Sequence, residues 1–252
     1  MIDLRNVSKT FTLHNQSSAV IEVVNDVTLS VAAGECVALT GASGAGKSTL
    51  MRMIYGNYLT QAGQIQIDGI DLVQAEPRDV IALRRETLGY VSQFLRVVPR
   101  VPTLDVVAEP LRAVGASATD AQARAEELLT KLNIPKRLWS LSPTTFSGGE
   151  QQRVNIARGF AHPYPAMLLD EPTASLDATN REVVLSLIEE AKARGAAIIG
   201  IFHDEAARAR VCDREIDVSQ FTPGLSSSSD AVGQSKESSS SDAVGQSKET
   251  AA

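Results

Sequence analysis

The chain has 252 residues, of which 43% are hydrophobic, and it carries a formal net charge of −6 with a pI near 5.2. This length allows one large domain or a domain with a subdomain, and the hydrophobic content is sufficient for a sizeable core. The excess of carboxylates argues against broad binding to nucleic acids or to anionic membranes, because both need a surplus of cations.

Targeting and membrane signals are weak throughout the sequence. The most apolar run, residues 196–202, is far shorter than the roughly 18 residues that a membrane span needs. The N-terminus reads as a strand and has no signal-peptide pattern. Cys36 and Cys212 are far apart in sequence, so we expect reduced, buried thiols and no disulfide framework. The sequence predicts a cytoplasmic protein with no direct membrane insertion.

The N-terminal part of the chain predicts strands. Residues 1–7 and 19–33 alternate between apolar and polar side chains, which is typical of strands in an antiparallel sheet. We expect Phe11 in the loop between them. Residues 35–40 form a short apolar run that indicates a buried strand.

A glycine-rich segment separates this strand from a predicted helix over residues 48–55, and it matches the P-loop pattern Gly-x-x-x-x-Gly-Lys-[Ser/Thr]. Its glycines let the backbone approach a ligand, and free N–H groups at the helix N-terminus attract a polyphosphate. Lys47 adds a cation for the β- and γ-phosphates, and the Ser48 hydroxyl can coordinate Mg²⁺. The predicted nucleotide-binding residues of this loop are Gly41, Ala42, Ser43, Gly44, Ala45, Gly46, Lys47, Ser48 and Thr49.

The middle of the chain changes from strand to helix patterns. Residues 64–69 and 88–93 read as short strands, and residues 94–143 turn helical. We place a helix start at Thr119, as part of a capping box, and expect Pro135 to end that helix. These features predict a helical subdomain at about residues 94–160.

The next apolar strand, residues 166–170, ends in Asp170 and Glu171. A P-loop ATPase holds Mg²⁺ with an aspartate at this place, and the following carboxylate can orient a water for attack on the γ-phosphate. An Asp-Glu pair at a strand end is on its own most often a solvated surface pair. The P-loop is what favours the catalytic interpretation.

Two further elements complete the folded part. A helix is expected to start at Thr179 and to end at Gly195 as its C-cap. A buried strand over residues 196–202 then ends at His203. Because strands alternate with helices, the sequence predicts a parallel α/β core.

Ser147, Gly148 and Gly149 begin a predicted helix that runs to about residue 159, where free N–H groups and the helix dipole favour an anion. Followed by Glu150-Gln-Gln-Arg, they resemble the signature motif of ATP-binding cassette (ABC) ATPases, and that resemblance covers nearly all of residues 1–218. It implies an α/β P-loop NTPase fold with a mixed core sheet, an N-terminal antiparallel β subdomain and an inserted helical subdomain.

The same resemblance implies roles for individual residues. Phe11 would stack on adenine, where the family more often has Tyr, and the signature would be contributed by the opposite subunit of a head-to-tail pair. In the signature, Phe146 replaces the usual Leu and Glu150 the usual Gln, and we expect both to be tolerated. The resemblance implies a Mg²⁺-dependent ATPase whose catalytic residues are Glu171, His203, Lys47 and Gln93 and whose metal ligands are Ser48, Gln93 and Asp170. It also implies a signature made of Ser147, Gly148, Gly149 and Glu150, and a loop after the Asp170 strand, called the D-loop, that contains Ser175 and Asp177.

Three segments, residues 91–100, 144–160 and 200–205, resemble the cassette subunits of the carbon–phosphorus lyase system (the PhnL family), and the unusual Asn155 and Gly159 contribute to that match. This resemblance implies ATP and Mg²⁺ as ligands, a second cassette and soluble lyase core subunits as partners, and no nucleic acid. The role implied is in attaching methylphosphonate to ribose triphosphate, the α-D-ribose 1-methylphosphonate 5-triphosphate synthase activity of the complex.

Two other hypotheses remain open. A transport ATPase of the lipoprotein-release or macrolide-export type shares the layout from Pro99 to Pro110 and the Glu-Gln-Gln-Arg ending of the signature. A cassette acting on DNA or ribosomes is a third, and the single cassette, the lack of a long insert and the acidic pI count against it.

The C-terminal segment, residues 223–252, differs in composition from the rest. Residues 226–237 are repeated without change as residues 238–249, and both copies are rich in Ser. Such a segment buries too little apolar surface to order itself. We therefore expect an ABC ATPase domain over residues 1–222 and a disordered tail whose role is open, with a spacer or sequence slippage favoured over a binding tail.

Overall fold

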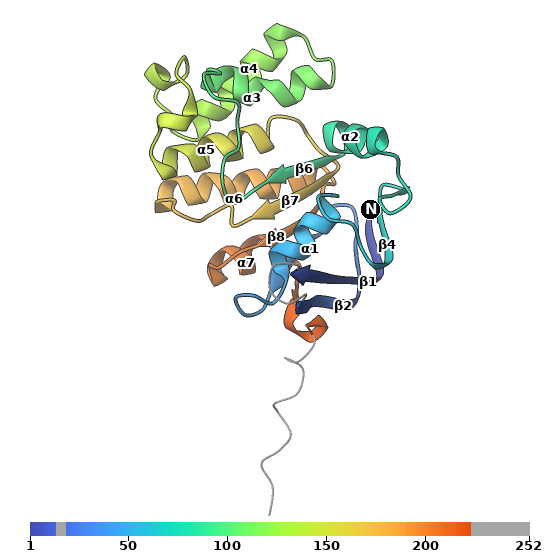
Figure 1. The fold of residues 1–252 in the computed structure, drawn as a ribbon. Coiled ribbons are helices and arrows are strands. Elements are labelled where there is room, and N and C mark those ends of the chain that lie inside the picture. Colours follow the sequence, from blue (N-terminus) through green and yellow to red (C-terminus); the bar gives the residue numbers. More distant parts are fainter. Residues whose placement is uncertain (14–18, 223–252) are drawn as a thin grey trace, which may run out of the picture.

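The computed structural model describes residues 1–13 and 19–222, which form two β-sheets and a layer of helices (Figure 1). The Ser-rich repeat of residues 226–249 lies outside the described residues. The predicted α/β P-loop fold is confirmed. The core sheet, however, was predicted to be mixed and is parallel at every described pairing, because the antiparallel strands form a separate second sheet.

The strands are β1 (Ile2–Leu13), β2 (Ala19–Val31), β3 (Cys36–Thr40), β4 (Ala62–Ile67), β5 (Ile70–Asp71), β6 (Leu88–Val91), β7 (Ala166–Asp170), β8 (Ala197–Ile201) and β9 (Arg214–Asp217). The helices are α1 (Lys47–Ile54), α2 (Pro77–Glu86), α3 (Thr103–Ala113), α4 (Ala118–Lys131), α5 (Gly148–Gly159), α6 (Ala178–Ala193) and α7 (Glu205–Val211), with short 3₁₀ turns at Lys136–Leu138, Pro143–Thr145 and Val218–Phe221.

The five-stranded parallel sheet has the order β6-β7-β8-β3-β9; its inner strands β7, β8 and β3 are buried on both faces, whereas the edge strand β9 is largely exposed. Successive residues of a strand point to opposite faces. In β3, Cys36 and Ala38 therefore join the core under α3–α6, while Val37 and Leu39 join the core that α1 shares with the second sheet. This double burial explains why these strands read as continuous apolar runs.

The second sheet is antiparallel with the order β2-β1-β4-β5. Its first strand is longer than predicted, because β1 continues past a series of register shifts to Leu13. Phe11 therefore pairs with Ile21 inside the sheet, and its predicted place in a loop is wrong. The pairing holds the Phe11 ring at a fixed position at one end of the sheet.

Helix starts differ from the prediction by two residues in two helices. The N-cap of α4 is Ser117, whose hydroxyl accepts from the Asp120 amide, so the predicted start at Thr119 is wrong. The N-cap of α6 is likewise Asp177 and not Thr179.

The predicted end of α6 is confirmed. Gly195 has φ 94°, and its N–H and that of Ala196 return to the carbonyls of Lys192 and Ala191. These paired bonds form a Schellman motif.

The two cysteines are closer than their separation in sequence indicates. The Sγ atoms of Cys36 and Cys212 lie 3.6 Å apart, across the junction of β3 and the segment after α7. Both are free thiols, as expected; Cys36 is fully buried and Cys212 is half-buried.

Candidate functional site

The P-loop connects the carboxyl end of β3 to the first turn of α1. Gly41, Gly44 and Gly46 have φ of 120°, 84° and 93°, a left-handed region that favours glycine. A side chain at Gly46 would approach Val24 Cγ1 to 2.8 Å, whereas the space around Gly44 is open. The loop thus presents backbone on its open side.

The charged end of Lys47 is folded back over the loop. Its Nζ donates to the carbonyl oxygens of Gly41 and Ala42, at 2.6 and 2.9 Å. The first turn of α1 contains no acidic residue, and Ser48 is exposed. The helix N-terminus, the free side of the loop and one cation together suit a polyphosphate.

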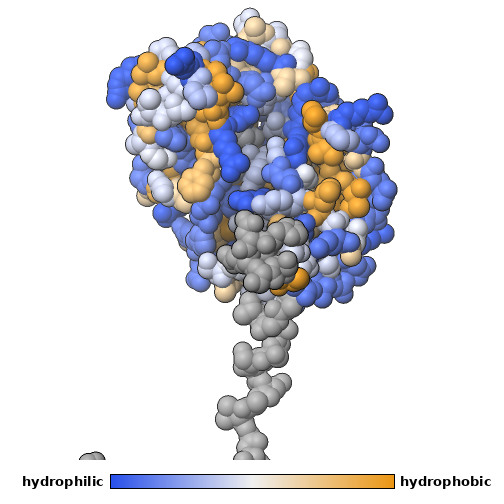
Figure 2. All heavy atoms as spheres, viewed as in Figure 1, coloured by the Kyte–Doolittle hydropathy of each residue, from blue (hydrophilic) through white to orange (hydrophobic). Residues whose placement is uncertain are grey.

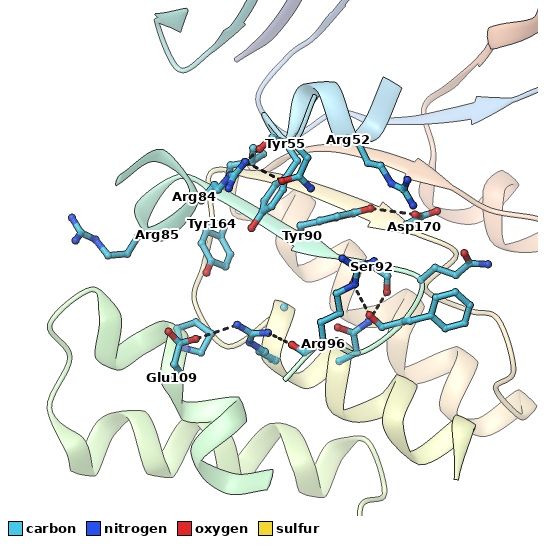
Figure 3. A pocket seen from close by; sticks show the side chains of 18 of the residues that line it. Arg52, Tyr55, Arg84, Arg85, Tyr90, Ser92, Arg96, Glu109, Tyr164 and Asp170 are labelled. Atoms are coloured by element: carbon cyan, nitrogen blue, oxygen red, sulfur yellow. Dashed lines mark hydrogen bonds and ion pairs between the residues drawn. The ribbon is translucent and has the colours of Figure 1, made fainter. Parts of the chain in front are cut away.

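Asp170 ends β7 and is only 5% exposed. The Tyr90 hydroxyl from β6 donates to its Oδ2 at 3.2 Å, and Figure 3 shows that hydroxyl pointing at the carboxylate. Burial raises the pKa of Asp170, and the neighbouring Glu171 raises it further, while the Tyr90 hydrogen bond opposes this. Burial thus disfavours the charged form of this carboxylate, and a cation bound next to it would stabilise that form.

Ser48, Gln93 and Asp170 offer one hydroxyl, one amide and one carboxylate. Among the described residues, no group of three or more His, Cys, Asp and Glu side chains could hold a metal ion alone. Mg²⁺ needs no such cage, because it takes one or two carboxylates together with substrate phosphates. The donor set fits Mg²⁺ brought by a nucleotide, which would neutralise phosphate charge there.

Glu171 is the meeting point of three other side chains. Its Oε1 lies 2.8 Å from His203 Nε2, at the end of β8, and its Oε2 accepts from Gln93 Nε2 at 3.4 Å, after β6. Its backbone carbonyl accepts from Gln152 Nε2 in α5, also at 3.4 Å. The φ of Glu171 is 54°, an unusual value for a non-glycine residue that these contacts help to hold.

The predicted residues after β3, β6, β7 and β8 thus gather at the carboxyl edge of one parallel sheet, where open α/β sheets bind ligands. Such an arrangement can bind a triphosphate, hold a water beside a carboxylate and place an imidazole near the transferred phosphate.

The predicted signature residues form the start of α5. Ser147 is the N-cap, and the Glu150 carboxylate accepts from its N–H at 3.0 Å and from its hydroxyl at 2.7 Å, completing a capping box. These bonds lower the pKa of Glu150. Gly148 and Gly149 are the first two residues of α5, where N–H groups have no partner within the helix, whereas Glu150 occupies the Ser147 donors. The expected anion site at this helix start stays a prediction.

The D-loop lies against this helix start. A side chain at Gly149 would lie 3.3 Å from the Ser175 carbonyl, and Ser175 has φ 60°. Asp177 caps α6 through the Asn180 amide, and these bonds lower its pKa. The structure therefore brings the predicted signature and the predicted D-loop into one surface.

Phe11 lies on the antiparallel sheet with its ring edge-on to Tyr58, at 5.4 Å between centroids. Lys9 Nζ lies 5.0 Å from the Phe11 centroid. The sequence did not single out Tyr58, because the contact joins β1 to the chain after α1. The Phe11 ring remains a candidate for adenine.

A cavity of about 610 Å³ extends from Asp170 and Gln93 outward, between α1 and α2 on one side and α3 and α5 on the other. Figure 2 shows this side of the molecule hollowed, with hydrophilic residues gathered along the hollow. Its lining is rich in arginine and tyrosine: Arg52, Arg84, Arg85, Arg96, Arg158, Tyr55, Tyr90 and Tyr164. Phe94, the residue after Gln93, also lines the cavity and is 69% exposed.

Sequence reasoning missed two contacts to the central carboxylates, those of Tyr90 and Gln152. Tyr90 lies in a recognised strand, and Gln152 lies in a motif whose other members were assigned. The sequence offered only two signals for these contacts: a polar side chain in the strand that lies next to the one bearing Asp170, and a Gln within the signature helix.

A family model described as "ABC transporter" matches residues 24–174 of this chain. The chain is 37% identical to the macrolide export ATP-binding/permease protein MacB of Brucella melitensis over 218 residues, which cover 86% of this chain and 33% of MacB. It is 38% identical to the pyoverdine export ATP-binding/permease protein PvdT of Pseudomonas putida over 190 residues, which cover 75% of this chain and 29% of PvdT. The chain spans about a third of the length of these relatives.

Solved structures agree with this match. The dimeric structure of MJ0796, a bacterial ABC transporter cassette, superposes with a TM-score of 0.79 at 30% identity, covering 87% of this chain and 95% of that one. A post-hydrolysis dimer of the same cassette bound to ADP and Pi gives 0.78 at 29% identity, with the same coverage. Within residues 1–13 and 19–222, no helix has the length and apolar character that crossing a bilayer requires.

Proposed function

This chain belongs to the ABC transporter family, and on that premise we propose that it is a Mg²⁺-dependent ATPase cassette that works as one of a pair. The observation that carries the proposal is the contact of both Gln93 and His203 with the Glu171 carboxylate, at the sheet edge that also bears the P-loop. There Glu171 orients and deprotonates the attacking water, and His203 and Lys47 stabilise the charge that develops on the γ-phosphate.

Pairing follows from the position of the signature. Homologous cassettes form dimers, and the start of α5 offers the free N–H groups of Gly148 and Gly149 on an exposed surface next to the D-loop. In a head-to-tail pair, ATP on one P-loop would meet this helix start of the partner. ATP binding closes the pair, and loss of the γ-phosphate opens it.

The work of this cycle is passed to a partner at the cavity between the core and the helices. The cavity ends at Gln93, which touches Glu171, so a protein seated there would respond to the state of the nucleotide. The cassette itself would act on the cytoplasmic side of the cell, with any membrane contact made by its partner.

The first candidate for that partner is an export permease. MacB and PvdT are export ATP-binding/permease proteins, and this chain matches about a third of each. These relatives favour a transport ATPase of the macrolide-export type.

The second candidate is the core of a carbon–phosphorus lyase. The unusual Asn155 and Gly159 line the cavity together with Ser92, Phe94 and Arg96. Residues of two of the segments that resemble the PhnL family therefore line or support the cavity at which the partner would bind. In that assembly the cassette would supply conformational change to α-D-ribose 1-methylphosphonate 5-triphosphate synthesis.

Affinity capture distinguishes the two candidates. Full-length protein is recovered from cells grown with a phosphonate as the sole phosphorus source, in detergent and in detergent-free buffer, with and without ATP. A soluble complex of lyase subunits supports the second candidate, and an integral membrane permease supports the first. Absence of ATP hydrolysis by the purified protein with either partner would contradict the ATPase itself.

A further inference from the structure

One face of α5 is bonded to the segment that follows β6. Asn155 is only 5% exposed, and its Nδ2 donates to the Ser92 carbonyl at 2.5 Å. Three residues along the same face, Arg158 Nη1 donates to the Arg96 carbonyl at 3.2 Å. Figure 3 shows Ser92 and Arg96 on this segment beside the cavity. The helix therefore holds the loop backbone on both sides of Gln93 and Phe94.

Gly159 sets how closely α5 can approach. A Cβ at this position would overlap Cγ2 of Val91, which is fully buried at the end of β6. Only glycine leaves room for this contact, because a buried β-branched side chain has no free rotamer to retreat into. The close packing at Gly159 and the hydrogen bond of Asn155 lie one turn apart and act on adjacent residues of the same segment.

The other contacts of this helix face lead to the catalytic centre. Gln152, three residues before Asn155, donates to the Glu171 carbonyl at 3.4 Å. Gln93, directly after Ser92, donates to the Glu171 carboxylate at 3.4 Å. One helix thus fixes both the residue that carries the carboxylate and the backbone that carries its amide partner.

We infer that Asn155 is a positioning residue for ATP hydrolysis, acting through the Ser92 carbonyl to hold the Gln93 amide at Glu171 and at the metal position. The inference rests on the ATPase proposed above and adds a determinant to it. Without the Asn155 donor, the Ser92 hydroxyl still donates to the Phe94 carbonyl, but this bond lies within the segment and does not fix Ser92 to α5. Gln93 would then sample orientations away from Glu171.

The test is Asn155→Asp in the full chain, because this substitution keeps the side-chain shape and replaces the donor by an acceptor that faces a carbonyl. We expect kcat for ATP hydrolysis to fall roughly tenfold through misplacement of Gln93, with ATP affinity within about twofold of wild type. The Mg²⁺ concentration for half-maximal activity should rise, since Gln93 is a proposed metal ligand. Asn25→Asp, the same change on the exposed side of β2, is the matched control.

A double-mutant cycle that combines Asn155→Asp with Gln93→Ala distinguishes an effect of Asn155 on the position of Gln93 from a general loss of stability. If Asn155 acts through Gln93, then Asn155→Asp lowers kcat less than about twofold in the Gln93→Ala background. An equal loss of kcat in both backgrounds, or wild-type kcat in Asn155→Asp, overturns the inference. An inactive wild type would instead overturn the ATPase proposal. If Asn155→Asp does not fold by circular dichroism, Asn155→Ala in the same cycle carries the test, with the same outcomes.

Discussion

Replacing Glu150 by Gln separates two opposite effects of one carboxylate. In the free protein, the carboxylate closes the capping box of α5 by accepting from the N–H and hydroxyl of Ser147. In the proposed pair, the same carboxylate would lie beside the γ-phosphate bound by the partner cassette. Gln keeps an acceptor oxygen and therefore the capping box, so the substitution removes only the charge.

The effect on the free protein is small and destabilising. A negative charge in the first turn of a helix contributes about 0.3–1 kcal/mol, and solvent screening of this half-exposed group favours the lower end. For a domain of this size, the melting temperature should fall by about 1–3 °C. Because hydrogen bonds lower the pKa of Glu150, this stabilisation is present above the unfolded value near 4.5 and is lost as the pH falls through the lower folded value.

The effect on ATP-driven pairing is larger and favourable. Two unit charges about 6 Å apart repel by roughly 3 kcal/mol at an effective dielectric constant of 20. If Mg²⁺ and solvent halve that repulsion, the substitution relieves about 1.4 kcal/mol at each of the two nucleotide sites, so Glu150→Gln should tighten the ATP-bound pair about a hundredfold. Sedimentation equilibrium with ATP, in a Glu171→Gln background that prevents turnover, measures this constant.

Glu150→Gln should therefore destabilise the free protein while strengthening ATP-driven pairing, and a control variant tests the second effect. Glu76→Gln removes the same charge from the exposed N-cap of α2 and should leave pairing unchanged. Pairing of Glu150→Gln that is equal to or weaker than that of the Glu171→Gln parent would mean that no phosphate approaches the start of α5.

Three further predictions concern single side chains. Burial raises the pKa of Asp170 in the folded protein. A buried acid of this kind destabilises the folded state once the pH has risen from the unfolded pKa past the higher folded pKa, because the charged form is then buried. Asp170→Asn should therefore raise the melting temperature at pH 7–8 in a thermal scan while abolishing Mg²⁺-dependent ATP hydrolysis. Lys47→Ala should lose on the order of 3 kcal/mol of transition-state stabilisation, seen as at least a hundredfold lower turnover in a phosphate-release assay. Ser117→Ala removes the N-cap of α4 and should cost about 1 kcal/mol by denaturant unfolding with unchanged ATPase activity.

The strands β3, β6, β7 and β8 of the parallel sheet could be predicted closely from the sequence, whereas the exposed edge strand β9 has no apolar run and was not predicted. The observed bounds of β7 are those of its apolar run, residues 166–170, because a strand buried on both faces needs apolar side chains throughout and ends where polar residues begin. The P-loop was equally clear, since its glycines and Lys47 have fixed spacing.

The exact starts of two helices, the presence of α2 and the position of Phe11 could not be predicted from the sequence. At both α4 and α6, a capping residue lies two positions before a threonine, and either side chain could accept from the first turn. The helix α2 was not predicted, because it buries only Leu83 and so has almost no apolar periodicity. Phe11 was misplaced because the strand β1 continues through irregular pairing that leaves no regular alternation.

The members of the candidate site were found by motif, but their contacts depend on tertiary packing. No local pattern indicates that Gln152 reaches the Glu171 carbonyl or that Asn155 reaches the Ser92 carbonyl. Glu150 was expected to be a neutral replacement for Gln, and its capping bonds with Ser147 became visible only in the folded helix.

In the proposed cycle, ATP holds two cassettes together until Glu171 promotes its hydrolysis. The most direct measurement is the mass of Glu171→Gln by light scattering after size exclusion, with Mg²⁺ and ATP, and with a related cassette added if the chain does not pair with itself. We expect Glu171→Gln to form a stable two-cassette species with ATP that dissociates when ADP replaces ATP, and the wild type to pair only transiently. A variant that stays monomeric under all these conditions, or that turns over ATP at the wild-type rate, would contradict it.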